Sequence, residues 1–301
     1  MESHLVEVTD SGSMDHVEAR IVELVARLFP DEFRALAEFC AGHAGFVDDR
    51  LARFDREIQF YLAYLERCDA LRANGLPFSY PTVSTAAEVA VEGGFDIALA
   101  GKLGGERPLV LNDFALSPPE RTLVVTGPNQ GGKTTFARMV GQLHYLAALG
   151  VPVPARSAGL ALADRIFTHF ERVEDVATLR GKLDDELVRV RQILDEATRE
   201  SVVILNEVFG STTLSDARQL GGAVLAEIAE LGCLAVCVTF VDELAGLGPA
   251  TVSMVAAVDA ADPSRRTFEV VRRPADGRAY AWALAEKYGL STEQLRRRIG
   301  R

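Results

Sequence analysis

A glycine-rich run between two apolar segments constrains this chain more than any other feature. An apolar segment, residues 123–126, precedes the run, and a helical pattern begins at Thr135. In this order of strand, loop and helix, backbone N–H groups can cradle a phosphate. The run consists of Gly127, Pro128, Asn129, Gln130, Gly131, Gly132, Lys133 and Thr134. The sequence therefore predicts a nucleotide-binding site.

The residue types in this loop match the chemistry of a phosphate site. Glycines allow the backbone to curl so that its N–H groups point at one phosphate. Lys133 is expected to reach the β- and γ-phosphates, and the Thr134 hydroxyl is expected to bind Mg²⁺. A chance match to the pattern is the alternative, and the strand and helix on either side disfavour it.

The composition limits the class of protein. The 301 residues are 48% hydrophobic, which is enough for one large α/β domain or two smaller ones. The longest apolar stretches have the length of strands, so we expect no membrane span. The net charge of −11 disfavours a chain that binds nucleic acid over its whole surface. Four cysteines are too few for a disulfide framework, and we expect a reduced, cytoplasmic protein.

Two of the cysteines, Cys233 and Cys237, lie in an apolar run that has the pattern of a strand. Positions of the same parity share one face of a strand, so both are expected to be small core residues. A zinc site is the alternative, but it needs two more ligands, and no other His or Cys lies near in the sequence.

Residues 15–78 are expected to form a helical segment. Apolar residues recur there at spacings of three and four, the pattern of a helix that packs along another helix. Pro30 is placed to begin a second helix, and turn residues 74–77 end the segment. The regularly spaced residues are Leu51, Phe54, Ile58, Tyr61 and Leu65. The polar residues 1–14 are expected to be a flexible tail or a remnant of cloning.

Residues 79–301 predict an α/β domain built around the glycine-rich loop. Short strands and turns are expected over residues 82–117, and a hairpin is expected near the C-terminus. The expected strands include residues 95–100, 109–111, 201–205, 234–239, 252–258 and 267–271. The expected helices include residues 183–198, 217–231, 279–288 and a last helix opened by a capping box at Ser291–Gln294.

A carboxylate follows the expected strand at residues 201–205. In phosphate-loop ATPases this place holds an acidic residue near the magnesium ion, and then a Glu that orients or deprotonates the attacking water. Glu207 fits the second role, and an ordinary strand-end carboxylate is the alternative. Asn206 can accept a hydrogen bond from a magnesium-bound water but brings no negative charge. We therefore predict Lys133 and Glu207 as catalytic residues, and Thr134 and Asn206, the latter through water, as the magnesium site.

The nine residues from Gly127 to Thr135 resemble the loop of the DNA mismatch repair MutS ATPases. The family loop is G-P-N-M-G-G-K-S-T, and this chain departs from it at Gln130 and Thr134. The Pro-Asn pair is far more specific than a general phosphate loop. Further segments are similar to the family's Y-V-P-A, D-R-I-F-T, D-E-I-G-R-G-T-S-T and C-terminal S-Y-G segments. They are residues 151–155 and 164–168, then 206–207 with 211–213, and finally 279–280 with 289–290.

The resemblance covers about residues 50–300 and implies a fold, ligands and partners. It implies a P-loop NTPase of the ABC ATPase type, with a mixed sheet and flanking helices. A helical lever in residues 15–78 would precede it, and a helix-turn-helix dimerisation element would end it. ATP and Mg²⁺ would bind, with Asn112 near the adenine. A homodimer is expected, and DNA is expected as a partner, either through this chain or through segments outside it.

Three positions depart from the family pattern. In MutS proteins an S-G-R-S-T segment reaches the γ-phosphate bound by the partner subunit. The aligned stretch here is residues 178–182, where Gly181 replaces the serine and Lys182 follows it. Asn206 replaces an Asp, and Phe240 replaces a His that can bond to the γ-phosphate. These changes predict altered gating, in a divergent branch of the family.

Three functions follow from these observations. The leading hypothesis is a MutS-like ATPase in which ATP holds two subunits together and hydrolysis releases them, in mismatch repair or related DNA maintenance. The first alternative is a nucleotide-switched dimerisation module with little or no hydrolysis, because of Asn206, Gly181 and Phe240. The second alternative is a P-loop kinase, for which the arginines at residues 265–266 and 272–273 are the only support.

Overall fold

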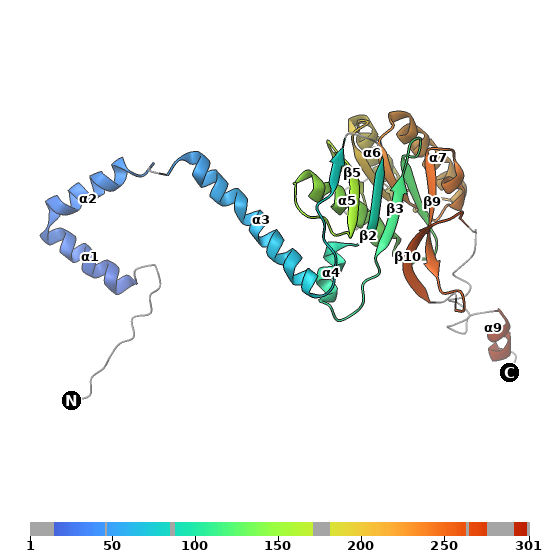
Figure 1. The fold of residues 1–301 in the computed structure, drawn as a ribbon, viewed down its shortest axis with the longest axis horizontal. Coiled ribbons are helices and arrows are strands. Elements are labelled where there is room, and N and C mark those ends of the chain that lie inside the picture. The colour runs from blue at the N-terminus through green and yellow to red at the C-terminus, as the bar shows by residue number, and fades with distance from the viewer. Residues whose placement is uncertain are drawn as a thin grey trace. The chain divides into compact units, whose positions relative to one another are not determined.

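The computed structural model describes residues 15–45, 47–84, 88–170, 181–262, 265–275 and 292–299. The chain divides into two compact units, Met1–Ala63 and Tyr64–Arg301 (Figure 1). The expected tail, residues 1–14, lies outside the described residues, as does the expected helix at residues 279–288.

The first unit is helical, as the sequence predicts. It contains α1 (His16–Leu28), α2 (Pro30–Gly42) and the beginning of α3 (Asp49–Ala73). The Asp15 carboxylate caps α1 by accepting hydrogen bonds from the backbone N–H groups of Val17 and Glu18. Pro30 is the first residue of α2, where its missing N–H is tolerated. Neither α1 nor α2 contains a buried residue.

The end of α3 belongs to the second unit, and its contacts there are specific. The Tyr64 hydroxyl donates a hydrogen bond of 2.6 Å to the Pro152 carbonyl. Leu71 is buried in a small cluster with Phe95 and Ala100. These contacts hold the last turns of α3 on the α/β unit.

The second unit contains two β-sheets among its described residues. One has the strand order β1-β5-β2-β3, and the other has the order β10-β9-β4-β8-β7-β6. The strands of the first sheet are β1 (Thr82–Ser84), β2 (Val89–Gly94), β3 (Asn112–Leu116) and β5 (Ser157–Ala161). The strands of the second sheet are β4 (Thr122–Thr126), β6 (Ile166–His169), β7 (Val202–Asn206), β8 (Leu234–Val238), β9 (Thr251–Val258) and β10 (Arg266–Arg272).

The central strands of the six-stranded sheet are buried on both faces. Every residue of β4, β7 and β8 is buried. Strands β9, β4, β8, β7 and β6 are parallel neighbours, and β10 pairs antiparallel with β9. Parallel strands covered on both faces have continuous apolar sequences, which is why β4, β7 and β8 were visible as apolar runs. The predicted hairpin is confirmed as β9 and β10.

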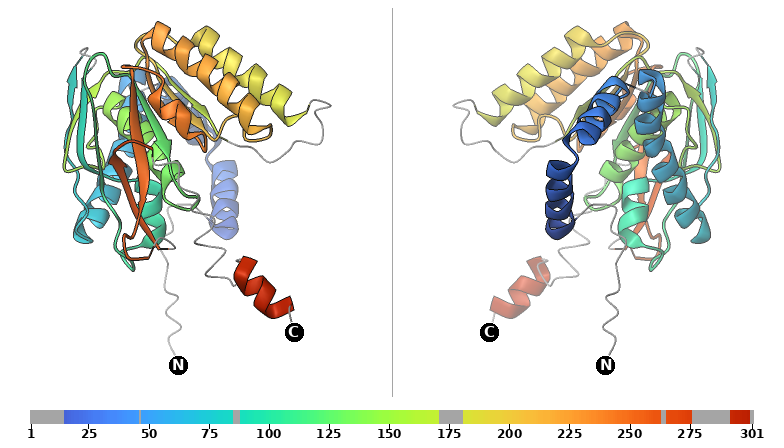
Figure 2. Two further views of the ribbon diagram at one scale, coloured as in Figure 1. Left: turned by 90° about the vertical axis from the view of Figure 1, so that its right-hand side faces the viewer. Right: turned by 90° about the vertical axis from the view of Figure 1, so that its left-hand side faces the viewer.

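Helices cover both faces of this sheet (Figure 2). Helix α5 (Lys133–Ala148) packs between the two sheets: its Phe136 ring meets the Phe114 ring of β3 edge-on, and a Cβ at its Gly141 would lie 2.5 Å from Ile204 of β7. Helices α6 (Lys182–Glu196) and α7 (Leu214–Leu231) pack on the other face. The short 3₁₀ helix η1 (Asp242–Gly246) follows β8.

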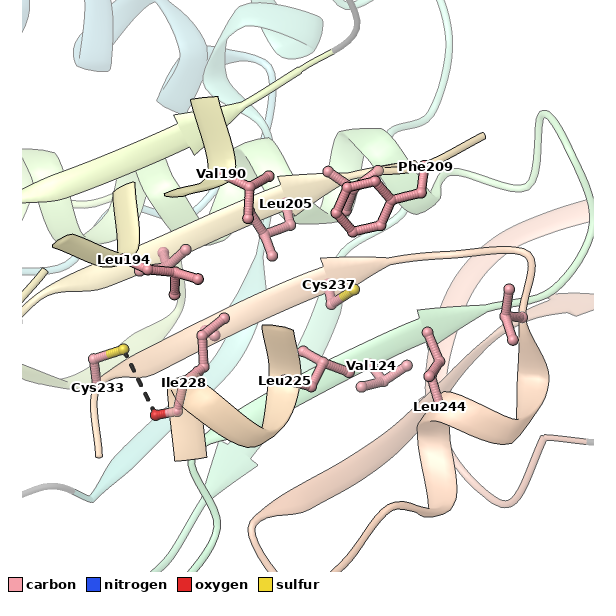
Figure 3. Close-up of a cluster of buried hydrophobic side chains, with 14 of the residues drawn as sticks. Val124, Val190, Leu194, Leu205, Phe209, Leu225, Ile228, Cys233, Cys237 and Leu244 are labelled. Atoms are coloured by element: carbon pink, nitrogen blue, oxygen red, sulfur yellow. Dashed lines mark hydrogen bonds between the residues drawn. The ribbon is translucent and has the colours of Figure 1, made fainter. Parts of the chain in front are cut away.

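The core beneath α6 and α7 contains both cysteines of the predicted strand (Figure 3). Cys233 and Cys237 are buried and form no disulfide. Burial raises the pKa of Cys233 to about 11 and that of Cys237 to about 12, so both thiols stay protonated at neutral pH. No cluster of three or more His, Cys, Asp or Glu side chains suited to a metal occurs within the described residues. The prediction that Cys233 and Cys237 are core residues is confirmed.

Two expected strands are wrong. The segment from Phe95 to Ala100 turns into helix α4 (Ile97–Leu103), because the Asp96 side chain accepts hydrogen bonds from the N–H groups of Ala98 and Leu99 and caps the helix. Residues 109–111 have no regular structure, and β3 begins at Asn112.

The C-terminal helix is confirmed as α9 (Thr292–Ile299). None of the helices in the described part of the chain is long and apolar enough to cross a membrane.

Candidate nucleotide-binding site

Three chain segments with predicted functional residues leave the same edge of the six-stranded sheet. Val238 of β8 is in register with Val125 of β4 on one side and with Asn206 of β7 on the other. These strands are parallel, so the residues that follow them gather at one edge. The structure thereby brings the glycine-rich loop, Glu207 and Phe240 together.

The glycine-rich loop has a backbone that side chains would disrupt. Gly127 has a φ of 108°, and a Cβ at this position would lie 2.9 Å from the Ala256 carbonyl oxygen of β9. A Cβ at Gly131 would lie 2.9 Å from the Pro128 carbonyl oxygen. The loop therefore needs glycine at both positions, as expected for a phosphate cradle.

Lys133 is folded back into this loop. Its side chain is buried, and its Nζ donates hydrogen bonds to the Gly127 carbonyl at 2.8 Å, the Pro128 carbonyl at 3.2 Å and the Asn129 Oδ1 at 3.2 Å. Burial lowers the pKa of Lys133, and the negative charge of Glu207 opposes this shift. The three acceptors are neutral, so the ammonium group can exchange them for the oxygens of a bound phosphate.

The first turn of α5 follows the loop directly. Gly132 is its N-cap residue, in the left-handed conformation, and no side chain caps this end. Thr134 and Thr135 lie half-buried in this turn. The N–H groups and the dipole at a helix N-terminus favour an anion there.

Asn206 leaves an acceptor that the described residues do not satisfy. Its Oδ1 is buried at the end of β7 without a hydrogen-bond partner. Buried polar atoms are normally paired with protein or ordered water, so this oxygen fits a water such as one held by Mg²⁺. Asn206 and the Thr134 hydroxyl offer neutral oxygen donors, which suit Mg²⁺ but add no charge.

The turn after β7 has an unusual backbone. Glu207 and Phe209 both have left-handed φ angles, 52° and 62°. The Glu207 N–H donates to the Val238 carbonyl at 2.8 Å, which holds the turn on β8. Glu186 of α6, which the sequence patterns do not single out, accepts a hydrogen bond of 3.0 Å from the Phe209 N–H.

A pocket of about 250 Å³ adjoins the loop at Gly132 and Thr135. Asn112, predicted near the adenine, lies in its lining and joins β3 to β10. Its Oδ1 accepts a 2.7 Å hydrogen bond from the Val270 N–H, and its Nδ2 donates to the Phe268 carbonyl at 3.4 Å. Most of the other lining side chains are apolar. Members of the lining include Phe95, Leu99, Leu103, Leu109, Phe136, Met139 and Phe268.

The sequence patterns did not predict two of the residues at this pocket. Phe268 sits with a φ of 62° at an irregularity in β10, and its side chain is exposed. Asp96 is buried and accepts hydrogen bonds from Arg138 and Gln142 of α5 at 2.8 and 3.0 Å. The only signal for Asp96 was its type, since Asp is a favoured N-cap residue.

Comparisons with known proteins support the family resemblance of the glycine-rich loop. A family model described as MutS domain V matches residues 123–295. The DNA mismatch repair protein MutS of Azorhizobium caulinodans is 33% identical over 255 residues. The aligned part covers 79% of this chain and 27% of that relative. This chain belongs to the MutS family. It spans about a quarter of the length of the relative it matches.

The three departures from the MutS pattern lie in different surroundings. Gly181 is the N-cap residue of α6 and Lys182 is the first residue of that helix, while residues 178–180 lie outside the described residues. Asn206 is buried. Phe240 follows β8 and is 45% exposed, and a Cβ at Gly210 would lie 3.9 Å from its ring. The Phe240 ring therefore lies beside the loop after β7.

Proposed function

We propose that residues 79–301 form a P-loop NTPase domain that binds ATP with Mg²⁺ and hydrolyses it. One observation carries the proposal: the buried Lys133 ammonium group lies inside a loop that tolerates no Cβ at Gly127, on the sheet edge that also holds Glu207. Phosphate binding and water activation both need groups at this edge.

The nucleotide phosphates would be held by the loop and by α5. Lys133 would leave the carbonyls of Gly127 and Pro128 and donate to phosphate oxygens, while the backbone N–H groups of the loop and of the first turn of α5 face the same anion. The apolar pocket beside Gly132 would take the base, with Asn112 in its wall. Phe268 is an exposed aromatic residue at this pocket, so its ring is suited to stack on the base.

Thr134 and Asn206 would hold hydrated Mg²⁺. When bound, Mg²⁺ supplies positive charge that stabilises the negative charge developing on the phosphates. The Thr134 hydroxyl would bind it directly, and the unsatisfied Oδ1 of Asn206 would accept a hydrogen bond from one of its waters. An Asp at position 206 would also contribute charge, so we expect this site to bind Mg²⁺ less tightly than one with a carboxylate.

Glu207 would orient the attacking water and accept its proton. Its backbone is fixed to β8 next to the glycine-rich loop, so its carboxylate starts from a defined position. Phe240 cannot add a hydrogen bond there. Together with Asn206, this predicts a slow turnover.

Membership of the MutS family supports two further parts of the proposal, a dimer and an action on DNA. The relative with 33% identity is named a DNA mismatch repair protein. We propose that ATP binding joins two copies of this chain, with Gly181 and Lys182 of one facing the nucleotide of the other. The helices of residues 15–78 would act as a lever, and hydrolysis would release the dimer in mismatch repair or related DNA maintenance.

A second function is favoured by the three departures. With Asn206, Gly181 and Phe240 in place of more reactive residues, the chain would act as a dimerisation switch that binds ATP and hardly hydrolyses it. Measuring the mass in solution and the phosphate release of the 301-residue chain with ATP and Mg²⁺ separates the two functions. Turnover that Glu207→Gln abolishes supports the ATPase. ATP-dependent dimers without phosphate release support the switch. If ATP causes neither dimerisation nor phosphate release, both functions are contradicted.

The role in DNA maintenance needs its own test. The binding of the chain to homoduplex, mismatched and branched DNA is measured with and without ATP. We expect ATP to change the affinity for at least one of these DNAs. Equal affinity for all three, with no effect of ATP, contradicts the proposed role.

A further inference from the structure

The loop after β7 adopts a conformation that its own residues disfavour. Glu207 and Phe209 are not glycines, yet both have positive φ angles. Such residues persist only where the surrounding structure fixes them. The position of Glu207 therefore depends on the contacts that hold this loop.

Contacts from two elements hold the loop. On one side, the N–H of Glu207 is bonded to β8 through the Val238 carbonyl. On the other side, the Glu186 carboxylate of α6 accepts hydrogen bonds from the Phe209 N–H at 3.0 Å and from the Ser211 hydroxyl at 3.5 Å. The Phe209 side chain is anchored as well, because it is 1% exposed and lies in the buried cluster of Figure 3 with Val190 of α6.

The Glu186 carboxylate is buried among apolar residues, which is rare for a carboxylate in a stable fold. It is 6% exposed on a helix whose neighbouring buried residues are apolar. A buried carboxylate is unfavourable unless it accepts strong hydrogen bonds. Here the bond to the Phe209 N–H offsets that loss and also satisfies a buried backbone donor. An apolar residue at position 186 would leave this donor without its partner.

Helix α6 connects this contact to another part of the proposed site. It begins immediately after Gly181, and Glu186 lies in its second turn. The first turn carries Lys182, which we have proposed to face the nucleotide of a partner subunit. One rigid helical turn therefore separates the partner-facing end of α6 from the residue that bonds the catalytic loop.

We propose that Glu186 is a positioning residue that holds Glu207 in place and transmits the position of the first turn of α6 to it. This inference rests on the proposed ATPase function. In this role Glu186 acts on Glu207 through the Phe209 N–H. A shift of α6 on dimerisation would then change the rate of hydrolysis while leaving the phosphate-binding loop unchanged.

The test compares Glu186→Ala with Glu186→Gln. The alanine leaves the Phe209 N–H unsatisfied, whereas the glutamine keeps one oxygen acceptor, and both hydrogen bonds of Glu186 use a single oxygen, Oε2. We expect Glu186→Ala to lower kcat about tenfold or more, as loss of one hydrogen bond to a charged group would. We expect Glu186→Gln to keep most of the wild-type kcat. In both variants the ATP dissociation constant should change by less than about threefold.

A neighbouring carboxylate provides the matched control. Asp185 precedes Glu186 on the same helix, and its side chain makes no hydrogen bond within the described residues. Asp185→Ala should leave kcat unchanged. Thermal unfolding of each variant is measured in parallel. If Glu186→Ala does not fold, Glu186→Asp, which draws the carboxylate back by one methylene, should show the loss of kcat with unchanged ATP binding.

The outcomes separate this inference from the function on which it rests. A wild-type chain with no turnover overturns both. A wild-type chain with turnover that Glu186→Ala and Glu186→Asp leave unchanged overturns the positioning role alone. Loss of ATP binding and kcat together, with no recovery in Glu186→Gln, shows a merely structural role and also overturns it.

Discussion

The glycine-rich loop and the loop after β7 occupy corresponding places but are held in different ways. Each follows a fully buried parallel strand, β4 or β7, and both leave the same sheet edge. The first is held mainly by its own glycines and its own lysine, whose Nζ bonds three groups of the same loop. It has one left-handed residue that is not glycine, Gln130, and one bond from outside, from Arg266 of β10 to the Asn129 carbonyl. The second holds non-glycine residues in left-handed conformations through bonds from β8 and α6.

The conformation of the first loop is therefore set mostly by local sequence, and that of the second loop by tertiary contacts. A loop that depends on its own residues keeps a recognisable sequence, and Gly127 to Thr135 match the MutS loop at seven of nine positions. A loop that depends on distant partners can change its own residues as long as those partners remain. The glycine-rich loop therefore departs from the MutS pattern only at Gln130 and Thr134, whereas the loop after β7 loses a charged residue at Asn206.

The largest expected effect falls on the second loop. Glu207→Gln keeps the shape of the side chain but removes its ability to take a proton. We expect kcat to fall by about 10²–10⁴-fold, the usual contribution of a general base. ATP affinity should stay close to that of the wild type, because the loop that we propose to bind the phosphates is unchanged. Phosphate release and nucleotide titration measure the two quantities, with Glu230→Gln on the exposed face of α7 as the control. A matching loss of affinity would mean that the two loops do not act separately.

The corresponding change in the first loop should act on binding. Lys133→Ala removes the buried ammonium group, and we expect the ATP dissociation constant to rise about 100-fold, since a hydrogen bond to a charged group contributes about 1.5–3 kcal/mol. The free energy of unfolding without nucleotide should fall by about 1–3 kcal/mol, because three oxygens of the loop lose their shared donor. Equilibrium titration with ATP measures the effect, and the exposed Lys102→Ala is the control. Unchanged affinity would exclude the loop as the phosphate site.

A backbone change tests whether the first loop is truly self-supporting. In Gly127→Ala the new Cβ would meet the Ala256 carbonyl oxygen, and alanine disfavours a φ of 108°. We expect the chain to lose about 1–3 kcal/mol of unfolding free energy, as for other strained backbone positions. Gly159→Ala is the control, because its nearest atom lies at 3.9 Å and its φ is not positive. Denaturant unfolding measures both variants, and equal stability would show that the loop can relax around a side chain.

The sequence predicted these two regions unequally for the same physical reason. Glycine spacing, the apolar runs of β4, β7 and β8, and the hairpin of β9 and β10 are local patterns. The strands and the hairpin are confirmed, and the nucleotide site read from the glycine spacing stays a prediction. Residues 95–100 were expected as a strand because their apolar pattern does not reveal that Asp96 caps a helix and pairs with Arg138, 42 residues away. Glu186 and Phe268 act through contacts that no spacing along the chain records. Glu207 was predicted from its place after a strand, but the contacts that fix it were not.

The smallest expected effect is a gain in the second loop. Asn206→Asp supplies the carboxylate that the MutS pattern has at the end of β7, where the buried Oδ1 of Asn206 has no hydrogen-bond partner among the described residues. With ATP and saturating Mg²⁺ we expect kcat to rise several-fold, about 1 kcal/mol of charge stabilisation, and half-maximal rate to need less Mg²⁺. Without Mg²⁺ the same carboxylate is a buried, unpaired charge, so the variant should unfold more easily than the wild type. The exposed Asn74→Asp is the control, and turnover measured against Mg²⁺ concentration decides the matter. If the rate and the Mg²⁺ requirement stay the same, the slow turnover comes from Phe240 or from the partner-facing end of α6 rather than from the missing charge.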